Sequence, residues 1–176
     1  HGLFGGAIAG LGTPAHHQRF LADALSLRVL GCFAMTERGH GSDVASLETT
    51  ISYDPDAGEF VVHSPHESSA KTYIGNAAAH GHMAAVFGQL VVDGIERGVH
   101  CILVPLRDAE GNPLPGVTLG DNGHKGGLLG VDNGTVAFDH VRVPRDLLLD
   151  RFGSVDEQGR YVSSIESPNR RFFTML

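Results

Sequence analysis

Residues 47–63 read Leu-Glu-Thr-Thr-Ile-Ser-Tyr-Asp-Pro-Asp-Ala-Gly-Glu-Phe-Val-Val-His, and this stretch decides the fold class. Leu47–Tyr53 and Glu59–His63 carry β-branched and aromatic residues at alternating positions, which is typical of strands. Between them, Pro55 fixes φ and Gly58 supplies the positive φ of a tight turn. The stretch therefore predicts a β-hairpin.

Further strands are expected towards the C-terminus. Ala84–Val92 and Val99–Leu106 flank the turn-forming residues Asp93–Gly98 and predict a second hairpin with a longer loop. Thr135–Val143 alternates between apolar and polar residues, which predicts one strand ended by Pro144, because proline has no N–H to donate. About three such pairings indicate a mainly β fold, organised as a β-sandwich or barrel.

Helical patterns flank the strands. Thr13-Pro14 is a good helix start, and apolar residues recur at helical spacing over residues 14–25. Ser167-Pro168 starts a second helix that the sequence hardly begins, and the chain opens on His1, so we expect a fragment of a longer protein. The expected parts are the end of a helical domain (1–30), a β-domain (31–150), and a linker with the start of a second helical domain (151–176).

Composition narrows the class of protein. The 176 residues predict one compact unit, and 41% hydrophobic with 19% charged residues exclude a disordered or collagen-like chain. Twenty acidic against thirteen basic residues give a net charge of −7, so we expect no broad cationic surface for nucleic acid or an anionic membrane. The longest apolar run, around Met83–Val92, is far shorter than the ~20 residues of a membrane span.

Cysteine and histidine usage bears on location and metal binding. Cys32 and Cys101 have no CxxC spacing, which favours a reducing compartment and predicts the cytoplasm. The histidine pairs lack cysteine or carboxylate partners at ligand spacing, so surface and loop roles are favoured and no metal site is predicted. These pairs are His16-His17, His63-x-x-His66 and His80-x-His82.

The segment Phe33–Asp43 is the first candidate binding site. An apolar strand runs into Thr36 and then into a turn in which Gly39 and Gly41 let the backbone approach a ligand. Successive N–H groups, with the hydroxyls of Thr36 and Ser42, can bind a phosphate or the polar edge of a heterocycle. The alternative is a plain glycine-rich turn with Ser42 as a cap, and the residues alone favour it.

The segment Lys71–Ala77 is the second candidate. Tyr73 is followed by Ile74 and by Gly75 at a strand boundary, and an aromatic face beside bare backbone suits a flat ring. Ordinary core positions for Tyr73 and Ile74 are the alternative, which the residues alone favour.

Taken together, the two segments resemble the middle region of the acyl-CoA oxidases, within the acyl-CoA dehydrogenase superfamily. Phe33–Asp43 is similar to the family's aromatic-x-x-Thr-Glu-x-Gly-x-Gly-Ser/Thr flavin loop, and Gly12–Phe20 is similar to the last long helix of its N-terminal domain. Further similar pieces follow in family order at Phe60–Pro65, Val104–Asp108, Leu114–Asp121, Gly130–Gly134 and Phe138–Pro144.

The resemblance implies a β-domain that holds the ring of FAD against an acyl-CoA thioester. Thr36 would bind the pyrimidine edge of the flavin through its hydroxyl and backbone N–H, and Ser42 would also face the CoA substrate. The cofactor-binding residues implied are Phe33, Met35, Thr36, Gly41, Ser42, Tyr73, Ile74 and Gly75.

The resemblance also implies a reaction. Acyl-CoA would lose an α proton and a β hydride to give trans-2-enoyl-CoA, with O2 as electron acceptor, in fatty-acid β-oxidation. The family's glutamate base lies in its C-terminal helical domain, so no catalytic residue is expected in this chain, which would be inactive alone. Glu37 is expected to be a loop carboxylate that accepts hydrogen bonds. The full-length enzyme would be a homodimer, peroxisomal in a eukaryote.

Two alternatives stay open. Gly75 stands where dehydrogenases carry Thr or Ser, which favours an oxidase, but Tyr73–Ala77 mixes the two patterns and Asp43 is the dehydrogenase-like choice. A dehydrogenase that uses an electron-transferring flavoprotein is therefore one alternative. The other is a non-catalytic β-sandwich interaction module.

Overall fold

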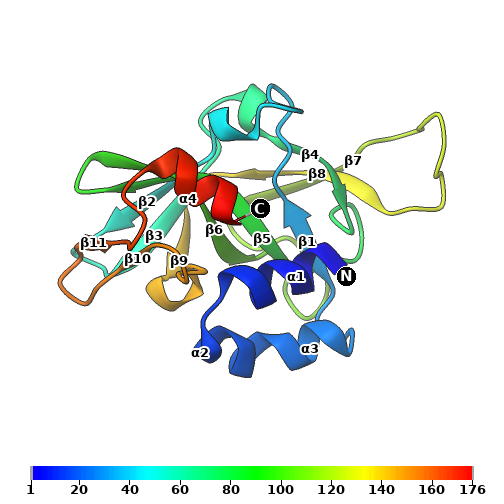
Figure 1. The fold of residues 1–176 in the computed structure, drawn as a ribbon. Coiled ribbons are helices and arrows are strands. Elements are labelled where there is room, and N and C mark those ends of the chain that lie inside the picture. Colours follow the sequence, from blue (N-terminus) through cyan, green and yellow to red (C-terminus); the bar gives the residue numbers. More distant parts are fainter. Residues whose placement is uncertain (1, 176) are drawn as a thin grey trace.

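The computed structural model of this chain describes residues 2–175, and it confirms the mainly β fold. The main sheet has six strands in the order β1-β5-β2-β3-β9, with β6 paired to β5 (Figure 1). The long strand β5 pairs in parallel with β1 and then β2, and antiparallel with β6. The strands are β1 (Gly31–Ala34), β2 (Thr50–Asp54), β3 (Glu59–His63), β5 (Met83–Val92), β6 (Ile95–Pro105) and β9 (Val141–Pro144).

A second sheet lies beside the first and has the order β4-β8-β7. Its strands are β4 (Lys71–Gly75), β7 (Val117–Asp121) and β8 (Asn133–Phe138). In Figure 1 the long connection between β7 and β8 extends away from the rest of the molecule. A small hairpin of β10 (Ser154–Val155) and β11 (Tyr161–Val162) follows.

The predicted helix over residues 14–25 is present as three consecutive pieces, α2 (Pro14–His16), a π-helical turn (His17–Leu21) and α3 (Ala22–Leu25). The C-terminal helix α4 (Pro168–Met175) begins at the expected proline and packs against β6. Short 3-10 turns occupy Val44–Ser46, Glu67–Ser69 and Arg145–Leu147.

Helix α1 (Gly2–Leu11) was not predicted, because its four glycines have low helix propensity. Tertiary packing compensates, since α1 buries Phe4 and Ile8 and contacts β1. A Cβ on Gly31 in β1 would overlap the ring of Phe4, so glycine is what lets the helix approach the strand this closely.

Two strand predictions need correction. Thr135–Val143 is not one strand: β8 and β9 lie in different sheets, because His140 adopts a left-handed φ of 51° and turns the chain between them. The second hairpin has a two-residue turn, Asp93-Gly94, with φ of 54° and 69°, so β6 begins at Ile95. Positive φ at both turn residues is the type I′ geometry that suits the twist of paired strands.

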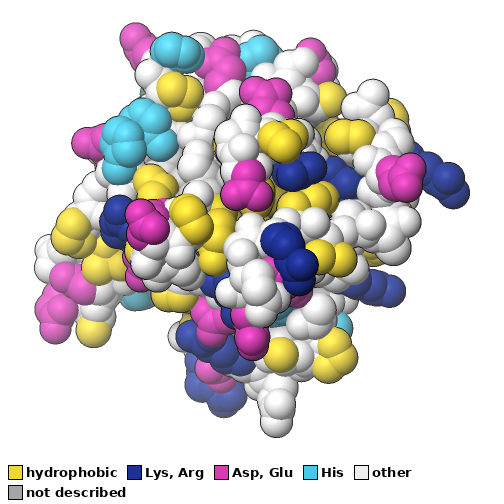
Figure 2. Space-filling view, turned by 90° about the vertical axis from the view of Figure 1, so that its left-hand side faces the viewer, with side chains coloured by type: hydrophobic (Ala, Val, Ile, Leu, Met, Phe, Trp, Pro, Cys, Tyr) yellow, Lys and Arg dark blue, Asp and Glu magenta, His cyan; other side chains and the backbone are white. Residues whose placement is uncertain are grey.

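The core takes buried side chains from both sheets and includes the fully buried Phe60, Leu90 and Leu103. Both cysteines are free and buried, and burial raises the pKa of Cys32 to about 12 and raises that of Cys101 as well. Among residues 2–175, no helix combines the length and the apolar character that a membrane crossing needs. On the face in Figure 2, acidic and basic side chains are interspersed, and histidines gather near its upper edge.

Candidate functional site

The two candidate segments lie side by side and are joined by backbone hydrogen bonds. Thr72 donates from its N–H to the carbonyl of Thr36 over 3.0 Å, and Arg38 donates in the same way to Ala70 over 3.0 Å. Residues 36–39 therefore run antiparallel to residues 68–72. The fold thus brings together the two stretches that the sequence singles out separately.

A buried lysine fixes this junction on the side that faces the core. Lys71 is fully buried, and its ammonium donates to Glu37 Oε1 over 2.8 Å and to the carbonyls of Met35 and Phe87 over 3.1 and 2.6 Å. Burial lowers the pKa of Lys71 to about 8, and the attraction of Glu37 opposes this, so the side chain stays protonated near pH 7. All three of its donors are used, so the ammonium rigidly links β4 to β5 and to the segment that follows β1.

Glu37 completes the link on the other side. Its side chain is 0% exposed. It accepts hydrogen bonds from the N–H and hydroxyl of Thr49, over 3.0 and 2.6 Å, and from the N–H of Glu48 over 2.7 Å. This is the hydrogen-bonding role expected for Glu37. Because Met35 and Glu37 are both fixed, the backbone of Thr36 between them is held from two sides.

The second segment presents an open surface. The pairing of β4 with β8 shifts register between Lys71 and Ile74, and in this bulge Tyr73 has φ of 57° and is 68% exposed. Ile74 is buried, but Tyr73 is not, so the core alternative is wrong for Tyr73 and right for Ile74. A Cβ on Gly75 would meet no atom within 4 Å, which leaves the face beside the tyrosine free.

The other predicted site residues lie along the chain before β2. Phe33 packs against Phe87, with ring centroids 4.9 Å apart, and lines a cavity of about 260 Å³ beside α1. Met35 is buried and Thr36 is half-buried. Gly41 and Ser42 are exposed in the loop before the 3-10 turn Val44–Ser46, and among residues 2–175 no hydrogen bond joins them to β4.

Two charged side chains, the half-buried Asp132 and the buried Arg107, hold the turn that follows β4, and sequence reasoning missed both. The carboxylate of Asp132 accepts hydrogen bonds from the N–H groups of residues 78–80 and from the His80 ring, over 2.8–3.1 Å. Burial alone would raise the pKa of Asp132, but these hydrogen bonds outweigh it and lower the pKa. Arg107 donates to three carbonyls of the same turn over 2.7–2.8 Å. The end of β4 is thereby rigid.

A comparison with known families identifies the whole region. The family model described as "Acyl-CoA dehydrogenase, middle domain" matches residues 32–141, which include both candidate segments. The chain belongs to the acyl-CoA dehydrogenase family. Both Lys71 and Asp132 lie inside the matched range, so the junction and the fixed turn are parts of the family's middle domain.

Family members with curated names are similar over almost the entire chain. An "Acyl-coenzyme A oxidase-like protein" of Mus musculus is 51% identical over 174 residues, which are 99% of this chain and 27% of that protein. "Acyl-coenzyme A oxidase 3, peroxisomal" of Arabidopsis thaliana is 46% identical over 170 residues, 97% of this chain and 25% of that protein. The chain thus spans about a quarter of the length of these relatives.

Solved structures of the family superpose closely. Acyl-CoA oxidase 1 of Arabidopsis thaliana matches with a TM-score of 0.91 and 39% identity, over 98% of this chain and 27% of that one. Acyl-CoA oxidase-1 of Caenorhabditis elegans, complexed with FAD and ATP, matches with a TM-score of 0.89 and 36% identity, over 92% and 25%.

Proposed function

We propose that this chain forms the β-domain of an acyl-CoA oxidase that desaturates acyl-CoA to trans-2-enoyl-CoA, with O2 as electron acceptor, in fatty-acid β-oxidation. In this proposal residues 31–150 form the domain that faces FAD and substrate. Residues 1–30 are the end of an N-terminal helical domain, and residues 151–176 are a linker and the start of a C-terminal helical domain. Relatives named as acyl-CoA oxidases support the reaction, and the word peroxisomal in several of their names supports a peroxisomal location.

One observation carries this proposal: the junction of the two candidate segments is rigid on its buried side and open on its solvent-facing side. On the buried side, Lys71 and Glu37 are 0% exposed and fix the backbone on both sides of Thr36. On the solvent-facing side, Tyr73 is exposed and Gly75 faces open space. A flat heterocycle needs such a surface, with an aromatic side chain, bare backbone and a polar group that is already positioned.

The residues present therefore fit FAD. When bound, FAD supplies the acceptor for the hydride that leaves the β carbon of the substrate. The Thr36 hydroxyl and N–H would bind the pyrimidine edge of the ring, and Ser42 would also face the CoA substrate. Tyr73, Ile74 and Gly75 would be the residues of β4 that hold the ring, and Phe33, Met35 and Gly41 would belong to the segment around Thr36 that holds it. Lys71 and Glu37 are positioning residues, because they reach the ring only through the backbone of Thr36.

A titration of the purified chain with FAD, followed by quenching of flavin fluorescence with FMN as the control, tests the proposal. Thr36→Ala should weaken FAD binding about fivefold, which corresponds to ~1 kcal/mol for one lost hydrogen bond. Gly75→Trp should block binding, because the indole fills the open face. Thr118→Ala, at an exposed position of β7, is the matched control and should bind as the wild type does.

Equal FAD binding by the wild type and both site variants would contradict the placement of the flavin. Binding without preference for FAD over FMN would favour the interaction module. No saturable binding would show that a further domain or a partner subunit completes the flavin site.

A dehydrogenase is the second candidate, because Tyr73–Ala77 and Asp43 carry dehydrogenase-like features. The full-length enzyme decides between them in a stopped-flow experiment in which reduced flavin is mixed with air-saturated buffer. Rapid reoxidation supports the oxidase. Slow reoxidation that accelerates only with an electron-transferring flavoprotein contradicts it.

A further inference from the structure

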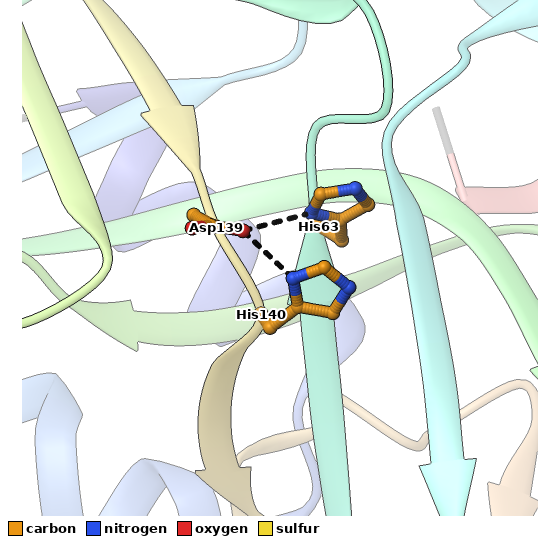
Figure 3. Close-up of side chains that lie close together, drawn as sticks. All are labelled: His63, Asp139 and His140. Carbon is orange, nitrogen blue, oxygen red and sulfur yellow. Dashed lines mark hydrogen bonds and ion pairs between the residues drawn. The ribbon is translucent and has the colours of Figure 1, made fainter.

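A cluster of possible metal ligands lies away from the proposed flavin surface, where β3 and β9 meet. His63 ends β3, and Asp139 and His140 form the turn between β8 and β9 (Figure 3). Val62 is paired with Val141 in the antiparallel register, so the next position places His63 opposite His140. The Nδ1 atoms of His63 and His140 lie 3.7 and 2.7 Å from the same oxygen of Asp139.

The backbone holds these three residues in place. Ser64 donates from its N–H to the carbonyl of Phe138 over 2.7 Å, and its hydroxyl oxygen accepts from the Phe138 N–H over 3.1 Å. Asp139 donates from its N–H to the carbonyl of Gly116 over 2.8 Å. The residues next to each possible ligand are therefore fixed before any ligand binds, which lowers the entropy cost of binding.

The cluster contains atoms that could bind a metal ion and are not saturated by hydrogen bonds. The Nδ1 atom of His63 is buried and has no hydrogen-bond partner in the structure. The two imidazole rings are stacked, with centroids 3.9 Å apart, so both present an edge to Asp139. The nearby Arg142 pairs with Asp54 and Glu59, and Asp139 is 81% exposed, so the carboxylate stays accessible to a cation.

We propose that His63, Asp139 and His140 form a binding site for a divalent transition-metal ion of the zinc class. Two imidazoles and one carboxylate are ligands that such ions prefer, and a water molecule would take the fourth position. Ligand atoms around a tetrahedral Zn²⁺ lie about 3.3 Å apart, given bonds of roughly 2.0–2.2 Å. The observed separations of 2.7 and 3.7 Å bracket this value, so small side-chain rotations suffice.

Binding requires both Nδ1 atoms to be unprotonated. In the hydrogen bond of 2.7 Å, His140 Nδ1 donates to the Asp139 carboxylate, so the ion displaces this proton, which Nε2 of the same ring can take up. The ion would link the end of β3 in the main sheet to the turn that leaves β8 in the second sheet. It should therefore stabilise the fold by an amount that rises with the logarithm of the zinc concentration once this exceeds Kd.

Zinc titration of the full 176-residue chain, without a histidine tag and after treatment with EDTA, tests the site by calorimetry. One Zn²⁺ should bind per chain, and His63→Gln, Asp139→Asn and His140→Asn should each weaken binding at least tenfold. Asparagine is chosen at position 140 because it tolerates a left-handed φ, so the turn is kept. Zinc should also raise the melting temperature of the wild type and leave that of the three variants unchanged.

His80→Gln is the matched control. His80 also pairs with a carboxylate, Asp132, over 2.8 Å, but among residues 2–175 no second imidazole joins this pair in a ligand cluster. Its removal should leave zinc affinity unchanged. The proposal is overturned if the wild type shows no saturable binding at millimolar zinc, if the three variants bind as the wild type does, or if His80→Gln loses as much affinity as they do.

Discussion

The Lys71–Glu37 pair and the His63–Asp139–His140 cluster each use a carboxylate to join segments that are distant in the sequence, but they differ in their exposure to solvent and in the hydrogen bonds left unused. The side chains of Lys71 and Glu37 are 0% exposed, and every lysine donor is used. In the cluster, Asp139 is 81% exposed and the Nδ1 atom of His63 has no partner. The first arrangement can only hold the fold, whereas the second can still gain a ligand.

The largest expected effect comes from breaking the buried pair. Lys71→Met leaves the carboxylate of Glu37 buried without its countercharge, so the free energy of unfolding should fall by about 3–5 kcal/mol. Urea denaturation followed by circular dichroism measures this loss. The double variant Lys71→Met/Glu37→Gln should recover part of it, because the amide keeps an acceptor oxygen for Thr49 without a buried charge. A loss below about 1 kcal/mol for Lys71→Met would show that water reaches the pair.

The buried His100 extends the comparison, because its burial changes its pKa and makes the stability of the fold depend on pH. His100 is 1% exposed, and desolvation lowers its pKa from 6.5 to about 4. Between pH 6.5 and pH 4 the unfolded chain binds a proton at His100 that the folded chain does not bind. The free energy of unfolding therefore has its full value above pH 6.5 and declines as the pH falls towards 4. The loss should be about 2 kcal/mol at pH 5, because each pH unit contributes ~1.4 kcal/mol.

Urea denaturation at several pH values measures this decline, and His100→Gln is the control. The glutamine cannot titrate, so the difference between wild type and variant should change with pH in the stated window. A difference that stays constant from pH 7 to pH 5 would contradict a neutral, buried imidazole.

The smallest expected effect tests the exposed cluster without metal. Asp139→Asn in EDTA should change the free energy of unfolding by less than about 0.5 kcal/mol, because an exposed charge contributes little. The same substitution should remove the stabilisation by zinc. If the variant is already much less stable in EDTA, the cluster holds the fold as Lys71 and Glu37 do, and the contrast between the two arrangements is lost.

Local patterns predicted much of the fold. The hairpin over residues 47–63 and the helix over residues 14–25 rest on alternation, helical spacing and proline placement, all of which act within a few residues. The resemblance carried the candidate site further, since it connected Thr36 with Gly75 before any geometry was known. The placement of the flavin at these residues stays a prediction.

What the sequence did not reveal depends on distant partners or on rare backbone geometry. Lys71, Arg107 and Asp132 each act on atoms more than 20 residues away, and no local pattern marks a charge as buried. Tyr73 and His140 adopt a positive φ, which is uncommon for residues other than glycine. The first conformation exposes a side chain expected in the core, and the second creates the turn that brings His140 to His63.

The burial of both cysteines would protect them from a product of the proposed reaction. An oxidase that passes two electrons from its substrate to O2 releases hydrogen peroxide beside its own polypeptide. Peroxide attacks thiolates, and susceptibility follows thiolate character and exposure. Cys32 and Cys101 are buried, and their raised pKa values keep both thiols protonated. Under the proposed reaction, the described residues of this domain would therefore offer the peroxide no reactive thiolate.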